Sequence, residues 1–142
     1  MDVRIKRVDK NIPLPRYETE GSVCFDLCAR ERTVIKGQEL GVVPSNTIIA
    51  TPPGFKLLIA LRSSTPKRFG LLAPHGIGII DQDYAGEEDE VLIQVFNFRK
   101  DDVVVERGER IAQATFVPIS RVVWKEQDRM CEKSRGGLGS TN

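Results

Sequence analysis

The chain has 142 residues and a nearly balanced charge, with 21 Lys and Arg residues against 20 Asp and Glu residues. This length is enough for one domain with its own hydrophobic core. A net charge of +1 produces no field that would attract nucleic acid or a membrane surface. There is no apolar run long enough to span a bilayer, and Met1–Arg4 lacks the pattern that begins a signal peptide. We therefore expect a cytoplasmic protein without nucleic-acid or membrane partners, and we leave a nuclear or organellar copy open.

Cysteine and histidine, two common metal ligands and nucleophiles, are few. Cys24, Cys28 and Cys131 have no zinc-site spacing and leave one cysteine over, so we expect reduced thiols. His75 is the only histidine of the chain. This argues against a multi-histidine metal site and against a Ser/His catalytic pair.

The first predicted strands are residues 3–8, which alternate loosely, and residues 23–29, which alternate cleanly. The core face of the second strand is expected to comprise Val23, Phe25, Leu27 and Ala29. The opposite face would carry Cys24, Asp26 and Cys28. Asp26 is thus a carboxylate held on a rigid strand, with a solvated strand charge as the plain alternative.

Short β-branched and apolar runs, separated by glycine, proline and asparagine, make up most of the remaining chain. They are residues 33–36, 40–43, 47–51, 55–61, 91–98, 101–105 and 111–117. Short strands with frequent turn signals and no helical period predict an all-β sandwich or barrel. Gln113 is a neutral hydrogen-bond donor on the last of these strands.

The stretch from Arg62 to Arg68 breaks the strand pattern. A serine at Ser63 or Ser64 followed by Pro66 is a helix-start signal, so we predict a short helical turn near residues 64–69. The free backbone N–H groups of such a start favour anions, and Arg62 with two hydroxyls would make a phosphate cradle. An ordinary capped turn with a surface arginine is the alternative.

Gly78–Gly86 carries two carboxylates two residues apart, Asp81 and Asp83, followed by Tyr84. On an extended strand the two carboxylates would point to the same face. Two like charges that close raise each other's proton affinity and can hold a metal ion or activate a water. A polar turn between two strands is the alternative.

The character of the chain changes at Lys125, after which few large apolar residues remain. Such a segment gains too little from packing to order itself. We therefore predict a β-barrel domain over residues 1–124 and a flexible tail over residues 125–142. Arg135, glycines that allow close backbone approach and two hydroxyls suit a flap that closes on phosphates, with a disordered terminus as the alternative.

Five stretches, in this order, resemble the motifs of the trimeric deoxyuridine triphosphatases (dUTPases). They are Val23–Ala29, Arg62–Ser64, Gly78–Gly86, Gly108–Gln113 and Arg135–Thr141, of which the third and fifth are the most specific. The resemblance implies a jelly-roll-type β-barrel of the β-clip kind and a homotrimer with active sites shared at subunit boundaries. It implies hydrolysis of dUTP to dUMP and pyrophosphate with Mg²⁺, which would sanitise the nucleotide pool and supply dUMP for dTMP synthesis.

The resemblance also implies roles for single residues in the reaction. Asp81 would activate the water that attacks the α-phosphorus, and Asp26 would hold the magnesium ion through water. The residues that would contact the phosphates are Arg62, Ser63, Ser64 and Gln113, together with Arg135 from a neighbouring subunit.

The nucleoside would be bound by the hairpin that precedes Tyr84. The Tyr84 ring would stack beneath the deoxyribose and leave no room for a 2′-hydroxyl, and the backbone around Ile79 and Ile80 would bind the uracil edge. His75 falls where this hairpin begins, so it is either a nucleoside contact or a structural or surface residue. From the tail, the substrate contacts would include Leu138, Gly139 and Ser140.

The chain departs from the family pattern at several positions. Leu61 replaces a common proline, and Glu87–Glu90 forms a short acidic insertion after the third motif. Leu138 stands where the family has a phenylalanine that covers the uracil. These departures remove no catalytic group, but they bear on substrate affinity and on closure of the tail.

Two other functions remain open at the level of sequence. A dCTP deaminase of the same fold also uses an Arg-Ser-Ser stretch, but it lacks the Asp83-Tyr84 pair after the catalytic aspartate. A non-catalytic barrel that retains nucleotide affinity as a regulator would have no need of Asp81, Asp26, Arg135 and Gln113 together. Incubation with dUTP and dCTP separates the three functions by release of pyrophosphate, of ammonia or of neither.

Overall fold

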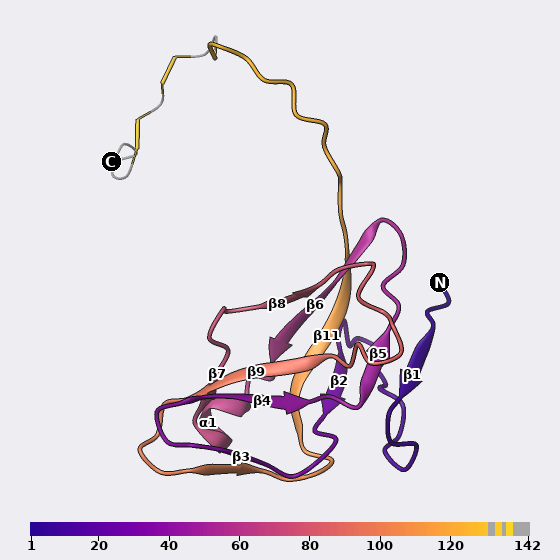
Figure 1. Cartoon of the computed structure of the whole chain (residues 1–142), viewed down its shortest axis with the longest axis vertical. Helices are drawn as coiled ribbons and strands as arrows, with labels where there is room; N and C mark the ends of the chain where they lie inside the picture. Colours follow the sequence, from indigo (N-terminus) through magenta and orange to yellow (C-terminus); the bar gives the residue numbers. More distant parts are fainter. Residues whose placement is uncertain (131–132, 135, 138–142) are drawn as a thin grey trace.

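The computed structural model describes residues 1–130, 133–134 and 136–137. This part of the chain forms eleven short strands and one short helix (Figure 1). The strands are β1 (Ile5–Arg7), β2 (Phe25–Cys28), β3 (Thr33–Ile35), β4 (Leu40–Pro44), β5 (Thr47–Ile49), β6 (Phe55–Leu61), β7 (Leu71–Leu72), β8 (Gly78–Ile80), β9 (Leu92–Asn97), β10 (Val103–Val105) and β11 (Arg110–Pro118). The helix is α1 (Thr65–Phe69). Most of these strands were predicted, with ends that differ by one or two residues.

The strands pair into four small sheets, and every pairing among them is antiparallel. The largest sheet has the order β2-β11-β6-β8, and a second has the order β4-β9-β7. The pairs β1-β5 and β3-β10 complete the structure, and Figure 1 shows β3 and β4 on the side away from β6 and β8. The nine-residue strand β11 pairs with both β2 and β6, so it forms the middle of the largest sheet.

The core lies between the sheets and consists of aliphatic side chains with one aromatic ring. Phe25, Leu27 and Ala29 are buried as predicted, whereas Val23 is 77% exposed. The prediction for Val23 was wrong because β2 begins only at Phe25. The alternating pattern therefore overestimated the strand by two residues at its start.

The short helix α1 lies where the sequence predicts a helical turn. Ser64 occupies the N-cap position, Pro66 lies in the first turn, and Gly70 ends the helix with a positive φ of 72°. Glycine adopts this left-handed conformation without the steric cost that a Cβ would bring. The Thr65 hydroxyl donates a hydrogen bond to the Ile111 carbonyl at 2.7 Å, which anchors the start of α1 to β11.

The stretch with the two carboxylates is not a strand over its whole length. Strand β8 ends at Ile80, and Gln82 and Asp83 form a turn. The prediction that Asp81 and Asp83 share one face of a strand was therefore wrong. The polar turn describes the local structure, because the ladder with β6 stops at the Leu57–Ile80 pair.

Beyond β11 the chain leaves the barrel as an extended segment (Figure 1). Residues 121–130 are exposed and contain neither helix nor strand. The predicted tail contacts Arg135, Leu138, Gly139 and Ser140 lie outside the described residues, as does Cys131. Within the described ranges, no helix is long and apolar enough to cross a membrane.

Candidate functional site

A cluster of opposite charges lies where β2, β6 and β11 meet. Asp26 on β2 forms an ion pair with Arg62, whose Nε lies 3.1 Å from one carboxylate oxygen. Arg62 lies just beyond the end of β6. Its other carboxylate oxygen pairs with Arg110 Nη1 on β11, also at 3.1 Å. The Asp26 side chain is only 11% exposed, against 29% for Arg62. Two guanidinium groups therefore hold this carboxylate in a fixed orientation.

Arg110 links this cluster to a second carboxylate, Glu18. The Arg110 Nη1 to Glu18 Oε1 distance is 2.8 Å. A hydrogen bond from Arg16 and the charges of Arg16 and Arg110 lower the pKa of Glu18. Glu18, Asp26 and Arg110 line one open cavity of about 370 Å³ beside β2.

Cys28 lies on the same face of β2 as Asp26 and lines the same cavity. Burial raises the pKa of the Cys28 thiol. A thiol is nucleophilic only as the thiolate, so this cysteine is a poor nucleophile at neutral pH. The prediction that the cysteines are free thiols holds for Cys24 and Cys28.

Gln113 and the two serines flank the charge cluster. Gln113 lies on β11 directly opposite Asp26 on β2, with Ala60 of β6 on its other side. Ser64 makes no capping hydrogen bond through its side chain. Within the described ranges, Ser63 also makes no side-chain hydrogen bond, and it is exposed. These side chains retain their hydrogen-bonding groups for a ligand.

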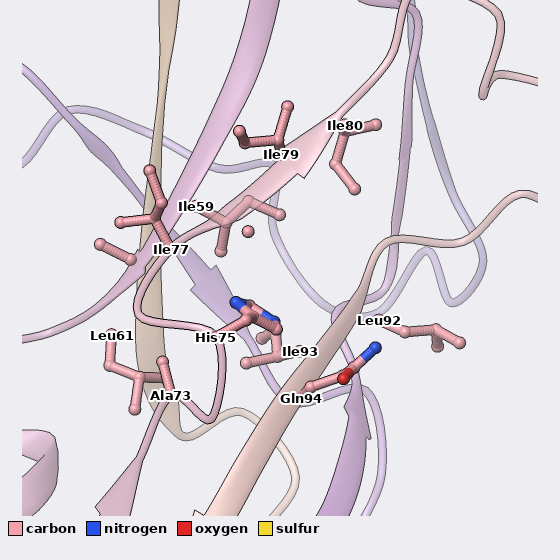
Figure 2. Close-up of a pocket in the computed structure, with 12 residues that line it drawn as sticks. Ile59, Leu61, Ala73, His75, Ile77, Ile79, Ile80, Leu92, Ile93 and Gln94 are labelled. Atoms are coloured by element: carbon pink, nitrogen blue, oxygen red, sulfur yellow. The ribbon is translucent and has the colours of Figure 1, made fainter.

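A second hollow lies at the connection from β7 to β8, which is not a hairpin because β7 pairs with β9 and β8 pairs with β6 (Figure 2). It has a volume of about 230 Å³ and is lined mostly by aliphatic side chains from β6, β8 and β9, with His75 and Gln94 as its polar side chains. His75 is exposed and projects over the hollow in Figure 2. Ile79 is 51% exposed, and Ile80 packs against the core. The connection from β7 to β8 thus borders an open hollow whose side chains are mostly aliphatic.

Asp81 and Tyr84 follow strand β8. The Gln82 amide donates to the Phe55 carbonyl at 2.9 Å, which places this turn at the start of β6. Asp81 is exposed, and the ion pairs of the described residues do not include it. Tyr84 is 36% exposed, and its hydroxyl donates to the Glu90 carbonyl at 3.1 Å.

The fold separates Asp81 from the charge cluster. Ile80 pairs with Leu57, and the backbone from Leu57 to Arg62 rises about 17 Å along a strand. Strands β2 and β8 are the two edges of the largest sheet, so Asp26 lies about 14 Å away from β8 across three strand spacings. A single chain therefore does not bring Asp81 and Asp26 to one small ligand.

The charge cluster around Asp26 offers few possible metal ligands. Within residues 1–130, no group of three His, Cys, Asp or Glu side chains lies close enough to hold a metal ion. Magnesium commonly keeps several waters and takes its other ligands from one or two carboxylates and substrate phosphates. Each oxygen of Asp26 has a second lone pair beyond its arginine contact. Asp26 therefore fits Mg²⁺ that arrives with a phosphorylated substrate, and it does not fit a metal caged by protein alone.

Comparison with known proteins decides the family, because a dUTPase family model matches residues 10–142. The chain belongs to the dUTPase family. It is 37% identical over 145 residues to a deoxyuridine 5′-triphosphate nucleotidohydrolase of Dictyoglomus turgidum, with 98% of this chain and 97% of that protein aligned. It is 38% identical over 144 residues to the Rickettsia bellii protein of the same name, with 98% and 94% aligned.

Solved dUTPases have the same fold. The Streptococcus mutans dUTPase is similar with a TM-score of 0.77 and 29% identity, covering 84% of this chain and 98% of that one. The Staphylococcus bacteriophage 80alpha dUTPase with dUPNHPP has a TM-score of 0.86 over 99% of this chain, and its 22% identity shows the fold alone. The predicted jelly-roll β-clip fold and the predicted dUTP diphosphatase activity are confirmed: this dUTPase hydrolyses dUTP.

Three residues that contact the candidate site residues were missed by the sequence reasoning. Arg110 forms ion pairs with both Asp26 and Glu18, and the Glu90 carbonyl accepts a hydrogen bond from the Tyr84 hydroxyl. Arg110 lies inside the fourth resembling stretch, so its position was a signal. Glu18 and Glu90 gave no such signal, because their contacts join segments that are distant in the chain or separated by a turn.

Proposed function

We propose that this dUTPase cleaves dUTP by attack of an Asp81-activated water on the α-phosphorus, in sites shared between the subunits of a homotrimer. The observation that carries the proposal is the placement of Asp81 at one edge of the largest sheet and of Asp26 at the other. Cleavage would release dUMP and pyrophosphate, which removes dUTP from the nucleotide pool and supplies dUMP for dTMP synthesis.

Asp81 is the proposed general base. Asp81 is exposed just after the end of β8, and its carboxylate forms no ion pair with the described residues. The carboxylate would accept a proton from water while the water oxygen bonds to the α-phosphorus. The bond from the α-phosphorus to the bridging oxygen breaks, and pyrophosphate leaves. Positioning and charge stabilisation provide most of the catalysis in phosphoryl transfer, so one base suffices.

The charge cluster is the proposed triphosphate site. Arg62 is held by Asp26 in a fixed orientation, and a preorganised guanidinium binds phosphate oxygens well. Ser63, Ser64 and Gln113 would donate further hydrogen bonds. On the tail, Arg135 would reach the γ-phosphate of a neighbouring site.

Asp26 would hold magnesium through water. When bound, Mg²⁺ would neutralise part of the phosphate charge and fix the geometry of the triphosphate. Asp26 itself has a second task that does not depend on the metal, because it orients Arg62 and Arg110. The two tasks can be separated by experiment.

The connection from β7 to β8 is the proposed nucleoside site. The backbone around Ile79 and Ile80 would bind the uracil edge over the apolar hollow, which His75 borders. The Tyr84 ring would lie beneath the deoxyribose and exclude a 2′-hydroxyl. Tail residues would complete the site as substrate contacts, namely Leu138, Gly139 and Ser140.

The same separation supports sites shared between subunits, and the number of three subunits rests on the resemblance to the trimeric dUTPases. If Asp81 acts on a phosphate bound at Arg62, the two must come from different chains, since about 17 Å of strand lies between their positions in one chain. A closed ring of three copies repeats one such contact three times. Light scattering tests this with a mass near three times the chain mass of 15.9 kDa.

One assay tests the chemistry. Incubation with dUTP is expected to release pyrophosphate, and incubation with dCTP is expected to release no ammonia. Ammonia from dCTP would indicate a deaminase of the same fold. Nucleotide binding without either product would indicate a non-catalytic regulator.

Replacing Tyr84 by alanine should relax sugar selection. Deleting the ring removes the clash with a 2′-hydroxyl while the phosphate contacts remain, so the kcat/KM for UTP relative to dUTP should rise at least about tenfold. Tyr17→Ala is the matched control, because Tyr17 is the other tyrosine and packs edge-on against Phe25. An unchanged ratio in Tyr84→Ala would contradict the sugar contact.

Replacing Asp26 by asparagine should raise the Mg²⁺ requirement. Loss of an outer-shell carboxylate commonly costs roughly 10–100-fold in metal affinity, so the Mg²⁺ concentration for half-maximal activity should rise by that factor. Glu18→Gln removes a partner of Arg110 without removing the proposed metal contact, and it should leave the midpoint in place. An unshifted midpoint in Asp26→Asn, with reduced activity at all Mg²⁺ concentrations, would assign Asp26 to orienting the arginines alone.

A further inference from the structure

The acidic segment Glu87–Glu90 is tied to the barrel at several points. The Asp89 carboxylate accepts the Gly86 N–H at 2.6 Å and closes a turn, and Glu87 forms an ion pair with Lys6 on β1. Strand β9 starts only two residues after Glu90. The segment is therefore a braced connection between β8 and β9, and not a free surface loop.

Glu90 is the most strongly held residue of this segment. Its carboxylate accepts Arg30 Nε at 2.9 and 3.2 Å and the Asn46 backbone N–H at 2.7 Å. The side chain is only 13% exposed. The hydrogen bond to Glu90 raises the pKa of Arg30, as expected for a close ion pair. Glu90 thus joins the loop after β2 to the turn between β4 and β5.

The surroundings of Glu90 are rigid. Asn46 is 1% exposed, adopts a positive φ of 68°, and exchanges hydrogen bonds with Asp9. Val91, which follows Glu90, is fully buried and forms backbone hydrogen bonds with Ser45 and Thr47. The Glu90 carbonyl therefore lies between the Glu90 carboxylate and the Val91 backbone, both of which are held by hydrogen bonds. Its position is well defined for this reason.

That carbonyl accepts the Tyr84 hydroxyl at 3.1 Å. Because the Tyr84 ring is 36% exposed, packing alone does not fix it, and this bond defines where the end of the ring lies. Exclusion of a 2′-hydroxyl by a ring works only if the ring cannot move aside. We propose that Glu90 is a positioning residue for sugar selection, holding Tyr84 against the deoxyribose through its carbonyl. This inference rests on the proposed contact between Tyr84 and the sugar.

The test compares kcat/KM for dUTP and UTP in the parent and in Tyr84→Phe, Glu90→Gln and Glu88→Gln. Tyr84→Phe deletes only the hydroxyl, and Glu90→Gln weakens the clamp with little change of shape. Each should raise the UTP-to-dUTP ratio about two- to tenfold, the range for loss of one hydrogen bond. The change should appear mainly as a lower KM for UTP and less as a higher kcat for UTP. Glu88→Gln makes the same charge change in the same segment and should leave the ratio unchanged, because Glu88 is exposed.

The outcomes separate this inference from the proposed function. If Tyr84→Ala changes the ratio but Tyr84→Phe and a folded Glu90→Gln do not, the sugar contact stands and the positioning role is wrong. If Tyr84→Phe changes the ratio and a Glu90→Gln protein with parental melting temperature does not, the backbone of Val91 holds the carbonyl without help from Glu90. If Tyr84→Ala itself leaves the ratio unchanged, the sugar contact fails and the inference fails with it. Tyr84→Phe retains the test if Glu90→Gln does not fold.

Discussion

Asp81→Asn should reduce kcat by roughly 10²–10⁴-fold, the usual contribution of a general base. An amide matches the carboxylate in shape but cannot accept the proton of the attacking water. Asp81 is exposed and follows the last residue of β8, so the substitution removes no core contact. The Kd of a non-hydrolysable dUTP analogue should therefore remain near the parent value. Pyrophosphate release and calorimetry measure the two quantities.

Asp83→Asn is the matched control for this experiment. Asp83 lies two residues further in the same polar turn and is also exposed, so both substitutions remove one negative charge from the same place. The control should retain turnover within about tenfold of the parent. An equal loss from both variants would contradict the assignment to Asp81 alone. Turnover of Asp81→Asn within tenfold of the parent would contradict the base assignment altogether.

Mixing Asp81→Asn with Arg62→Ala should restore activity that neither variant has alone. The two residues lie at opposite ends of β6, so a shared site would take Asp81 from one chain and Arg62 from another. In randomly mixed rings at equal amounts, about one quarter of such sites would receive both intact residues. If every site used both residues of one chain, no mixture would contain an intact site.

Two controls make this mixing experiment decisive. Differently tagged chains must be recovered in one complex, which proves that subunits exchange. A protein with both substitutions, mixed with an inactive partner, should restore nothing. Recovery near one quarter supports shared sites, whereas no recovery after proven exchange contradicts them. Asp81→Asn mixed with a chain that ends at Glu132 asks the same question of the tail.

Local sequence patterns predicted most of the elements because they depend on neighbouring residues. Alternation placed Phe25 and Leu27 in the core and Asp26 on the opposite face, since successive side chains of a strand point to opposite sides. The Ser64–Pro66 signal placed the start of α1, because serine suits the N-cap position and proline suits the first turn of a helix. The same reasoning overextended β2 to Val23, since alternation carries no information about where pairing with β11 begins.

In the candidate site too, local motifs could be predicted from the sequence, whereas contacts between distant segments could not. The sequence alone named Asp26, Arg62, Asp81 and Tyr84, because their motifs are local and resemble those of one family. It could not show that Arg62 pairs with Asp26, nor that Asp81 lies at the far edge of their sheet, since strand order joins segments distant in the chain. It treated Glu87–Glu90 as an acidic insertion of unknown role. Only the fold places Glu90 against Arg30 and Asn46 and its carbonyl against Tyr84, because these contacts form only when separate segments of the chain pack together.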